Sequence, residues 1–321
     1  MIDTASTNLS AASIFDDEVV DHTTPKILIH LHIHKTAGSS LNSLVKHNFC
    51  RSGIFEWVSR HDKSGGLDLG TSDSVKQKLQ EFGLNRVEYI SGHVPFGIHE
   101  MLPASAKYFT LVRNPVERIV SLFYWRQQSP KSARPPFNAN GRPLSFEEYV
   151  ESGDVHLDNL QVRVLSGASE LNPAAASAPS EVILASPVTR VHLEQAKDNI
   201  AKHFIAAAPI GHIAECALVL RAIYRWPMRR LYNEKKNRNR YRPATADVPA
   251  RLKGLIEKAN TYDIELCDWI NKRFSEQRKL YEPELSKDLR RYDAANRRLN
   301  FIGTMVPTGV KRILAKRFLW R

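Results

Sequence analysis

A short apolar segment that runs directly into a polar turn and a helix constrains the fold of this chain more than any other feature. Residues 27–33 are rich in β-formers, residues 34–40 (HKTAGSS) form the turn, and apolar residues at helical spacing follow. Two more apolar stretches, 87–91 and 108–112, also end in turns, and Pro115 is suited to the first position of a helix. Short strands that alternate with helices predict an α/β domain with a central parallel sheet.

Further elements are expected towards the C-terminus. Residues 204–208 form a strand candidate, and helical periodicity is present over residues 188–203, 213–224, 248–259 and 262–281. Residues 127–143 are polar and rich in Pro and Gly, which favours a surface loop, and residues 172–180 form an Ala/Ser/Pro linker. We expect three parts, namely a disordered arm at 1–25, one folded domain over 26–283, and a basic helical C-terminal extension over 284–321.

Composition indicates a soluble globular protein of a reducing compartment. Apolar residues make up 42% of the 321 residues and charged residues 25%, as is usual for folded domains. No apolar stretch approaches the ~20 residues of a membrane span, and the first 25 residues hold acidic but no basic residues, unlike a secretory leader. The three cysteines lie far apart and predict no disulfide framework. A cytoplasmic location is therefore expected.

Positive charge is concentrated in the last third of the chain. The formal net charge is +12, and residues 221–321 hold 26 Lys and Arg against 11 Asp and Glu. This asymmetry is typical of a nucleic-acid, membrane-surface or phosphorylated partner, although a solvated helical face would also produce it. Residues 310–321 alternate basic residues with Leu, Phe and Trp, so an amphipathic helix at the inner membrane surface is one option.

The 34–40 turn has the composition of an anion-binding loop. Backbone N–H groups at a helix N-terminus bind anions, and a lysine adds a point charge. The turn is not a Walker A motif, because Lys35 and Thr36 come before Gly38. Ser and Thr are also common helix-capping residues, so phosphate binding and ordinary capping both fit these residues.

Six segments share their sequence and their order with one family. They are residues 32–40 (HIHKTAGSS), 92–97 (GHVPFG), 108–121 (YFTLVRNPVERIVS), 159–163 (NLQVR), 233–238 and 260–263 (NTYD). Together they resemble the sulfotransferases that use 3′-phosphoadenosine-5′-phosphosulfate (PAPS), in particular the heparan sulfate 2-O/6-O and related carbohydrate enzymes. The resemblance covers about residues 27–281. It departs at His34, where the family commonly has Pro, at Asn114, which replaces a frequent Asp, and at Ser91, which replaces the first His of a His-Gly-His motif.

The resemblance implies a P-loop nucleotide-kinase-like parallel sheet and assigns roles to residues of these segments. Lys35 would stabilise the oxygen that bridges phosphate and sulfate. The remaining cofactor contacts would come from the loop at the 5′-phosphate, from two residues at the 3′-phosphate and from a basic loop over the nucleotide. The residues at the 5′-phosphate are Thr36, Ala37, Gly38, Ser39 and Ser40. Those at the 3′-phosphate are Arg113 and Ser121, and those of the basic loop are Lys236 and Arg238. Lys35 can replace a metal here, because sulfate carries less charge than a transferring phosphoryl group.

A histidine is the expected general base, because an attacking hydroxyl must lose its proton near neutral pH. His93 follows a glycine at a predicted strand end and matches the second histidine of the family motif, so it is the first candidate. His99 is the rival, six residues along the chain. His30, His32 and His34 alternate on one predicted strand face, which leaves a zinc site as a minor alternative, and no metal is expected.

The sequence thus predicts a PAPS-dependent sulfotransferase that transfers a sulfuryl group by in-line displacement. The expected acceptor is a hydroxyl of a glycan, a glycolipid or a similar molecule, and no nucleic-acid partner is expected. A P-loop nucleotide kinase is the nearest enzyme alternative, although the Gly-Lys-[Ser/Thr] order and a clear Mg²⁺ carboxylate are missing. A basic module that binds nucleic acid or a membrane surface is the non-enzymatic alternative.

Overall fold

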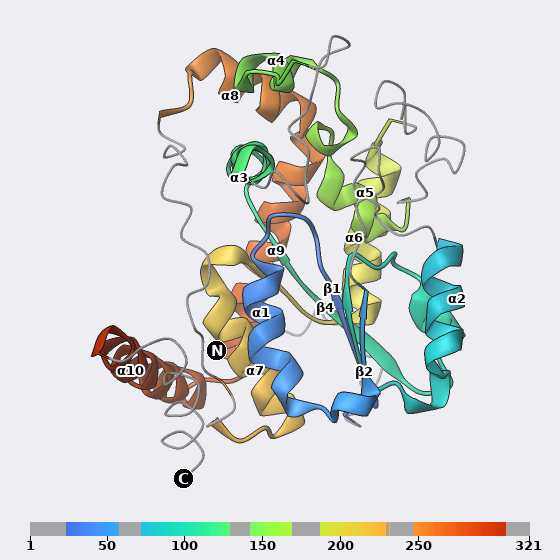
Figure 1. The fold of residues 1–321 in the computed structure, drawn as a ribbon, viewed down its shortest axis with the longest axis vertical. Helices are drawn as coiled ribbons and strands as arrows, with labels where there is room; N and C mark the ends of the chain where they lie inside the picture. The colour runs from blue at the N-terminus through green and yellow to red at the C-terminus, as the bar shows by residue number, and fades with distance from the viewer. Residues whose placement is uncertain are drawn as a thin grey trace, which may run out of the picture.

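A five-stranded parallel sheet forms the centre of the protein, which is described here by a computed structural model (Figure 1). The structure describes residues 24–57, 72–128, 142–168, 187–228, 231 and 247–305. The strands are β1 Ile27–Leu31, β2 Ile54–Trp57, β3 Tyr89–Gly92, β4 Ala106–Val112 and β5 Phe204–Pro209. Their order is β2-β3-β1-β4-β5, and every pairing is parallel. The predicted α/β class with a parallel sheet is confirmed.

Helices cover both faces of the sheet, because side chains of a strand alternate between its two faces. Ile27, Ile29 and Leu31 of β1 enter one apolar cluster, whereas Leu28 enters the other. The first cluster is covered by α2 Ser72–Phe82, α5 Leu160–Ser166, α6 Arg190–His203 and α9 Thr261–Lys279. The second is covered by α1 Gly38–Val45 and α7 Ile213–Tyr224, with α10 Glu284–Met305 packed on α7 (Figure 1).

A third apolar cluster lies beyond the carboxyl end of the strands (Figure 1). It joins α3 Pro115–Gln128, α4 Phe146–Glu151 and α8 Ala250–Ala259. Short 3-10 helices complete the described elements, namely Lys46–Asn48, Arg51–Gly53, Leu84–Arg86, Ile98–Met101, Val155–Leu157 and Ile210–His212. Among the described helices, none is long and apolar enough to cross a membrane.

Most predicted elements are present with small shifts at their ends. Pro115 begins α3, as predicted, and the helices expected over 188–203, 213–224, 248–259 and 262–281 are α6, α7, α8 and α9. The first strand ends at Leu31 rather than at residue 33, because the chain leaves the sheet to form the turn before α1. The prediction that His32 and His34 lie within that strand is therefore wrong. β2, α2, α4 and α5 were not predicted.

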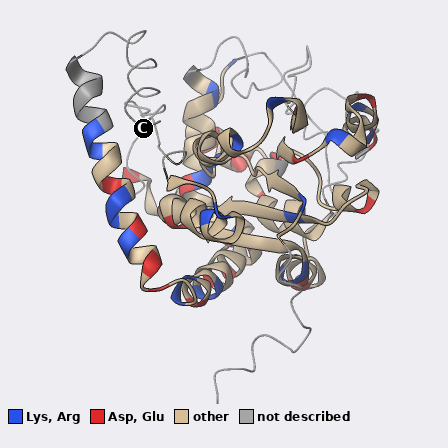
Figure 2. Cartoon of the chain, turned by 90° about the horizontal axis from the view of Figure 1, so that it is seen from below, with Lys and Arg blue, Asp and Glu red and all other residues tan. Residues whose placement is uncertain are grey.

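Several predictions fall outside the described residues. These are the arm up to residue 23, most of the 127–143 loop, the 172–180 linker, Lys236 and Arg238, and the 310–321 tail. The basic extension is described as far as α10, which carries Lys and Arg together with Asp and Glu (Figure 2). Its exposed basic residues are Lys287, Arg290, Arg291, Arg297 and Arg298.

Candidate functional site

The polar turn follows the central strand of the sheet. β1 lies between β3 and β4, so residues 32–37 leave the sheet at the point where successive connections run to opposite sides. In open parallel sheets, ligands bind at the carboxyl ends of strands at such a switch point. The turn, the residue after β3 and the residue after β4 therefore meet at the position expected for a site.

The turn has a tight backbone that ends in an uncapped helix. Lys35 and Ala37 have positive φ angles of 65° and 62°. Such angles are unusual for residues other than glycine, so the backbone of the turn is strained at these two positions. Ala37 is the N-cap of α1, and no side chain caps that terminus. The Thr36 hydroxyl is buried and donates to the Ile33 carbonyl at 2.9 Å, so its proton is used within the turn. Thr36 therefore offers its backbone N–H rather than a hydroxyl donor.

Gly38 is required by the close approach of a histidine ring. A Cβ atom at Gly38 would lie 2.0 Å from Cδ2 of His32, which no side chain permits. The first residue of α1 is therefore packed directly against His32, and His32 fixes how the helix begins.

Arg113 links the end of β4 to the turn. Its guanidinium is 9% exposed and donates from Nη1 to the Lys35 carbonyl at 3.2 Å. It also pairs with Glu117 at 3.1 Å. The side-chain amide of Gln161 accepts from the Arg113 N–H at 2.9 Å and donates to the Arg113 carbonyl at 2.8 Å. Arg113 is thus held in place on the same side of the turn as Lys35.

One face of α3 continues from Arg113 along the turn. Glu117, Ser121 and Trp125 follow at intervals of four residues, which places them on one side of the helix. Nζ of Lys35 lies 4.7 Å from the centroid of the Trp125 ring, a cation–π distance. The structure therefore brings Lys35 to the helix that bears Ser121. Trp125 was not predicted, although its spacing of four from Ser121 was a usable signal.

His93 follows β3 and faces the same turn. Gly92, with φ 137°, is required before it, since a Cβ there would lie 2.2 Å from the Trp57 carbonyl oxygen. Nδ1 of His93 lies 2.6 Å from the His32 carbonyl oxygen, which can only accept. Nδ1 therefore carries the proton in the neutral ring, and Nε2 is the nitrogen with the basic lone pair.

The histidines around His93 form a stack of rings. The His32 ring lies 4.5 Å from the His93 ring and the His34 ring 3.5 Å from it, both nearly parallel, while His30 stacks on His32 at 5.4 Å. Burial lowers the pKa of His30 to about 3, and burial also holds the pKa values of His32 and His34 well below the usual range. These three rings are neutral at physiological pH.

The stacked arrangement does not suit the zinc alternative. Imidazole nitrogens coordinate in the plane of the ring, and near-parallel planes aim their lone pairs side by side rather than at a common point. Within the part of the chain that the structure describes, no group of three His, Cys, Asp or Glu side chains could hold a metal ion.

His99, the rival base, lies in a different environment. Its Nδ1 is 2.9 Å from the Tyr108 hydroxyl, which also accepts from the Gly97 and His99 N–H groups at 3.1 Å. Its ring contacts are Phe96, Tyr108 and His203. Burial lowers its pKa, but the ring is not part of the stack around His93.

Two further predicted segments, residues 159–163 and 260–263, are hydrogen-bonded to each other next to Arg113. Asn159 donates from its N–H to the Asn260 side chain at 3.2 Å, and Asp263 accepts from the N–H groups of Gln161 and Val162 at 3.1 and 2.8 Å. These contacts join α5 to α9, and Asp263 also accepts at 3.2 Å from the side-chain amide of Gln161, which fixes the amide that holds Arg113. Asn114 caps α3 by accepting from the Val116 N–H at 3.0 Å, as an Asp would.

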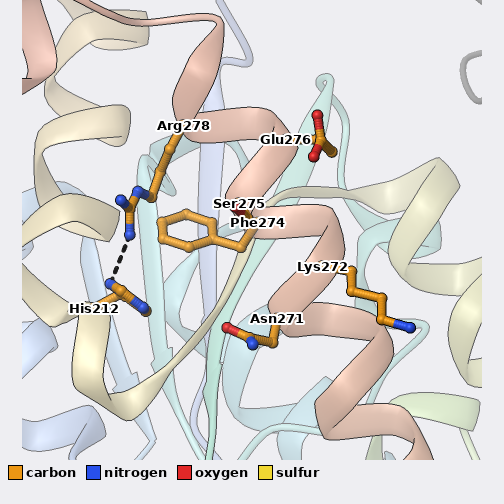
Figure 3. A pocket seen from close by; sticks show the side chains of 7 residues that line it. All are labelled: His212, Asn271, Lys272, Phe274, Ser275, Glu276 and Arg278. Carbon is orange, nitrogen blue, oxygen red and sulfur yellow. Dashed lines mark hydrogen bonds between the residues drawn. The ribbon is translucent and has the colours of Figure 1, made fainter. Parts of the chain in front are cut away.

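A separate cavity lies on α9, away from the turn (Figure 3). It measures about 270 Å³ and is lined by α9 and by His212, whose Nδ1 lies 2.9 Å from Nη1 of Arg278 and 2.8 Å from Oε1 of Glu215. None of its lining residues belongs to the predicted site. A small cavity does adjoin the stack and is lined by His32, Ile33, His34, His93, Val94, Pro95 and Val164.

Comparison with models of protein families gives a match that covers most of the chain. The model of a family described as the sulfotransferase family matches residues 19–269, which include the turn, His93, Arg113 and the Asn159 and Asn260 segments. A search of curated proteins finds no match to this chain.

Proposed function

Because the chain belongs to the sulfotransferase family, we propose that it transfers a sulfuryl group from PAPS to a hydroxyl of a carbohydrate or similar acceptor. The observation that carries the proposal is the hydrogen bond from Arg113 to the Lys35 carbonyl. This bond holds Arg113, the candidate ligand of the 3′-phosphate, beside the turn that bears the candidate ligands of the 5′-phosphate. PAPS differs from ordinary nucleotides in having phosphates on both the 3′ and the 5′ positions, so adjacent anion sites suit it.

The 5′ end of the donor is assigned to the turn. The N–H groups at the start of α1 and the hydroxyls of Ser39 and Ser40 would hold the phosphate, with the helix dipole adding to the attraction. Lys35 would neutralise the charge that grows on the bridging oxygen as the bond to sulfur breaks. No metal is assigned a role in this mechanism.

The 3′-phosphate is assigned to Arg113 and Ser121. The guanidinium would give charge-assisted hydrogen bonds, and Ser121 lies on the same face of α3. Lys236 and Arg238 are proposed to contact the nucleotide from the basic loop that contains them.

His93 is proposed as the general base. The fixed proton on Nδ1 leaves Nε2 to accept the proton of the attacking hydroxyl, while the bond to the His32 carbonyl holds the ring. His99 is the second candidate for the general base, but its hydrogen bond with Tyr108 supports a structural role.

The acceptor is proposed to be a glycan or glycolipid, with the protein in the cytoplasm and its basic C-terminal segment in contact with an anionic membrane. The positive charge of α10 and of residues 310–321 supports that contact. The kinase and nucleic-acid alternatives are not favoured by the family match.

Arg113→Ala tests the donor assignment by nucleotide binding. Loss of a charge-assisted hydrogen bond of about 1.5–3 kcal/mol should weaken adenosine 3′,5′-bisphosphate binding by about 10- to 150-fold and leave AMP binding nearly unchanged. Calorimetry measures both affinities, and Arg190→Ala, at an exposed arginine of α6, is the control. Equal losses for the two nucleotides would reject the 3′-phosphate assignment.

A further inference from the structure

The His93 ring is enclosed between two other imidazoles. His34 lies 3.5 Å from it with an interplanar angle of 5°, and His32 lies 4.5 Å from it at 23°. Two rings that both stack this closely on a third must occupy its opposite faces. A rotation of the His93 ring about its Cβ–Cγ bond would therefore displace one of them, and the hydrogen bond of Nδ1 with the His32 carbonyl sets which edge of the ring faces the site.

The His34 ring also contacts the ring of His156. His34 is 5% exposed, and its ring meets the His156 ring edge-on at 6.0 Å and 82°. His156 is fixed in turn by Asp154, whose Oδ1 accepts from Nδ1 of His156 at 2.6 Å, and Asp154 pairs with Arg126 at 2.9 Å. The Nε2 atoms of His34 and His156 are buried and make no hydrogen bond within the described residues. Neither ring is held by a hydrogen bond at that nitrogen, so packing orients the His34 face against His93.

We propose that His34 is a positioning residue for His93, and that its neutral ring locks the plane and the tautomer in which His93 presents Nε2 to the acceptor hydroxyl. The role rests on the proposed function of His93. When Nε2 takes the hydroxyl proton, the imidazolium that forms lies between two neutral π faces, an arrangement that favours a cation. A second positive charge at 3.5 Å would be strongly unfavourable, so the stack holds one proton and His34 remains neutral.

The charged and titratable groups near the stack fit this division of roles. Burial and the neighbouring His93 both lower the pKa of His34, and burial also lowers the pKa of His156 despite the opposing effect of Asp154. Besides one another, the stacked rings are affected by Lys35, Arg118 and His156, and His156 is affected in turn by Asp154, Arg126 and Arg118.

Two substitutions at His34 separate positioning from proton transfer. His34→Phe keeps an aromatic face that cannot be protonated, so kcat should stay within a few-fold of the original and the acidic limb of the pH–rate profile should remain. His34→Ala removes the face, and kcat should fall by about 10- to 100-fold, as for other residues that orient a functional ligand. The affinity for adenosine 3′,5′-bisphosphate should be unchanged in both variants. His93→Asn, in contrast, should lose the acidic limb.

A second readout needs no turnover. ¹⁵N-histidine NMR of the whole protein should show the His93 ring in the Nδ1–H tautomer, and this should persist in His34→Phe. In His34→Ala the other tautomer should become populated. His203→Ala, which removes a partly buried histidine of α6 outside the stack, is the matched control and should leave the tautomer and kcat unchanged.

The outcomes distinguish the two levels of the proposal. A protein without sulfuryl transfer from PAPS would overturn the proposed function, whereas the tautomer measurement would still decide whether His34 positions His93. An unchanged tautomer and kcat in a folded His34→Ala protein would overturn the inference. Loss of the acidic limb in His34→Phe would also overturn it, because His34 would then be a proton acceptor itself.

Discussion

Both ends of Lys35 are held by the region around α3. Its carbonyl accepts from Arg113, and its ammonium group lies over the Trp125 ring. The charge that Lys35 would face grows as the leaving phosphate separates from sulfur, so its effect should be larger in the transition state than in the bound donor. We expect Lys35→Ala to lower kcat by about two to three orders of magnitude, with a much smaller change in nucleotide affinity, as measured by steady-state kinetics and calorimetry.

Lys46→Ala is the control for that measurement. Lys46 is a partly exposed lysine that pairs with Glu56 at 3.3 Å, away from the turn, and its loss should leave kcat unaltered. Turnover of the unmodified protein should also persist when divalent metal is chelated. A strict requirement for Mg²⁺ would contradict the role given to Lys35 and would favour a kinase.

The residues of the turn could be selected from sequence, but their partners could not. Lys35, Arg113 and His93 have charge or basicity and follow strand candidates, so their types and positions indicate chemistry. Gln161 lies in a segment that the sequence singles out, and Trp125 lies four residues after Ser121. Their contacts with Arg113 and Lys35 join residues distant in sequence, however, and sequence order does not show which side chains will meet. The alternation of histidines had the same limit. It predicted that the three rings share one face of a strand, whereas His32 and His34 lie in the turn and stack on His93.

At the scale of elements, the junction between β1 and α1 depends on the absence of a side chain at Gly38. Gly38→Ala should displace the His32 ring or the start of α1, since the added Cβ would lie 2.0 Å from that ring. We expect a loss of about 1–3 kcal/mol in the free energy of unfolding, together with weaker nucleotide binding, because the turn and the helix N-terminus move together. Chemical denaturation and calorimetry measure the two effects.

Gly254→Ala gives the comparison for a glycine without such contact. Gly254 lies within α8, and a Cβ there would meet nothing within 4 Å. Alanine should stabilise that helix by about 0.5–1 kcal/mol. If both substitutions were equally tolerated, the packing of Gly38 on His32 would not be what fixes the turn.

The elements that sequence failed to predict are those with little local signal. β2 has only four residues, includes the exposed Glu56, and lies at the edge of the described sheet, where it pairs with β3 alone among the described strands. α2 buries Val75 and Leu79 on one side, but most of its remaining residues are polar. The buried strands β1, β3 and β4 were predictable because water is excluded from both of their faces, which leaves continuous apolar runs.

At the scale of the whole molecule, the buried histidines should make stability sensitive to mild acid. Each has a lower pKa in the folded state than the usual 6.5, so the unfolded chain binds more protons as the pH falls below that value, and stability is lost. His30, with a folded pKa of about 3, should alone contribute a loss of about 1.4 kcal/mol per pH unit between pH 6.5 and 3.

Urea unfolding between pH 7 and 5 measures this slope in a range where carboxylates remain largely ionised. His30→Phe, which retains a ring against Phe109, should reduce the slope by about one proton. A free energy of unfolding that stays constant over this range would contradict the neutral state of the stack.

The strand order also determines when the central strand β1 can pair with both of its neighbours during synthesis. Of the strands that the structure describes, β1 is the first to leave the ribosome, and all five of its residues are buried in the finished sheet. Its second neighbour, β4, ends at Val112, about 80 residues later, which corresponds to roughly 4–16 seconds at about 5–20 residues per second. The nascent chain therefore carries β1 without its second partner strand through that interval, and the turn of residues 32–37 acquires its shape only after β3 and β4 have been translated.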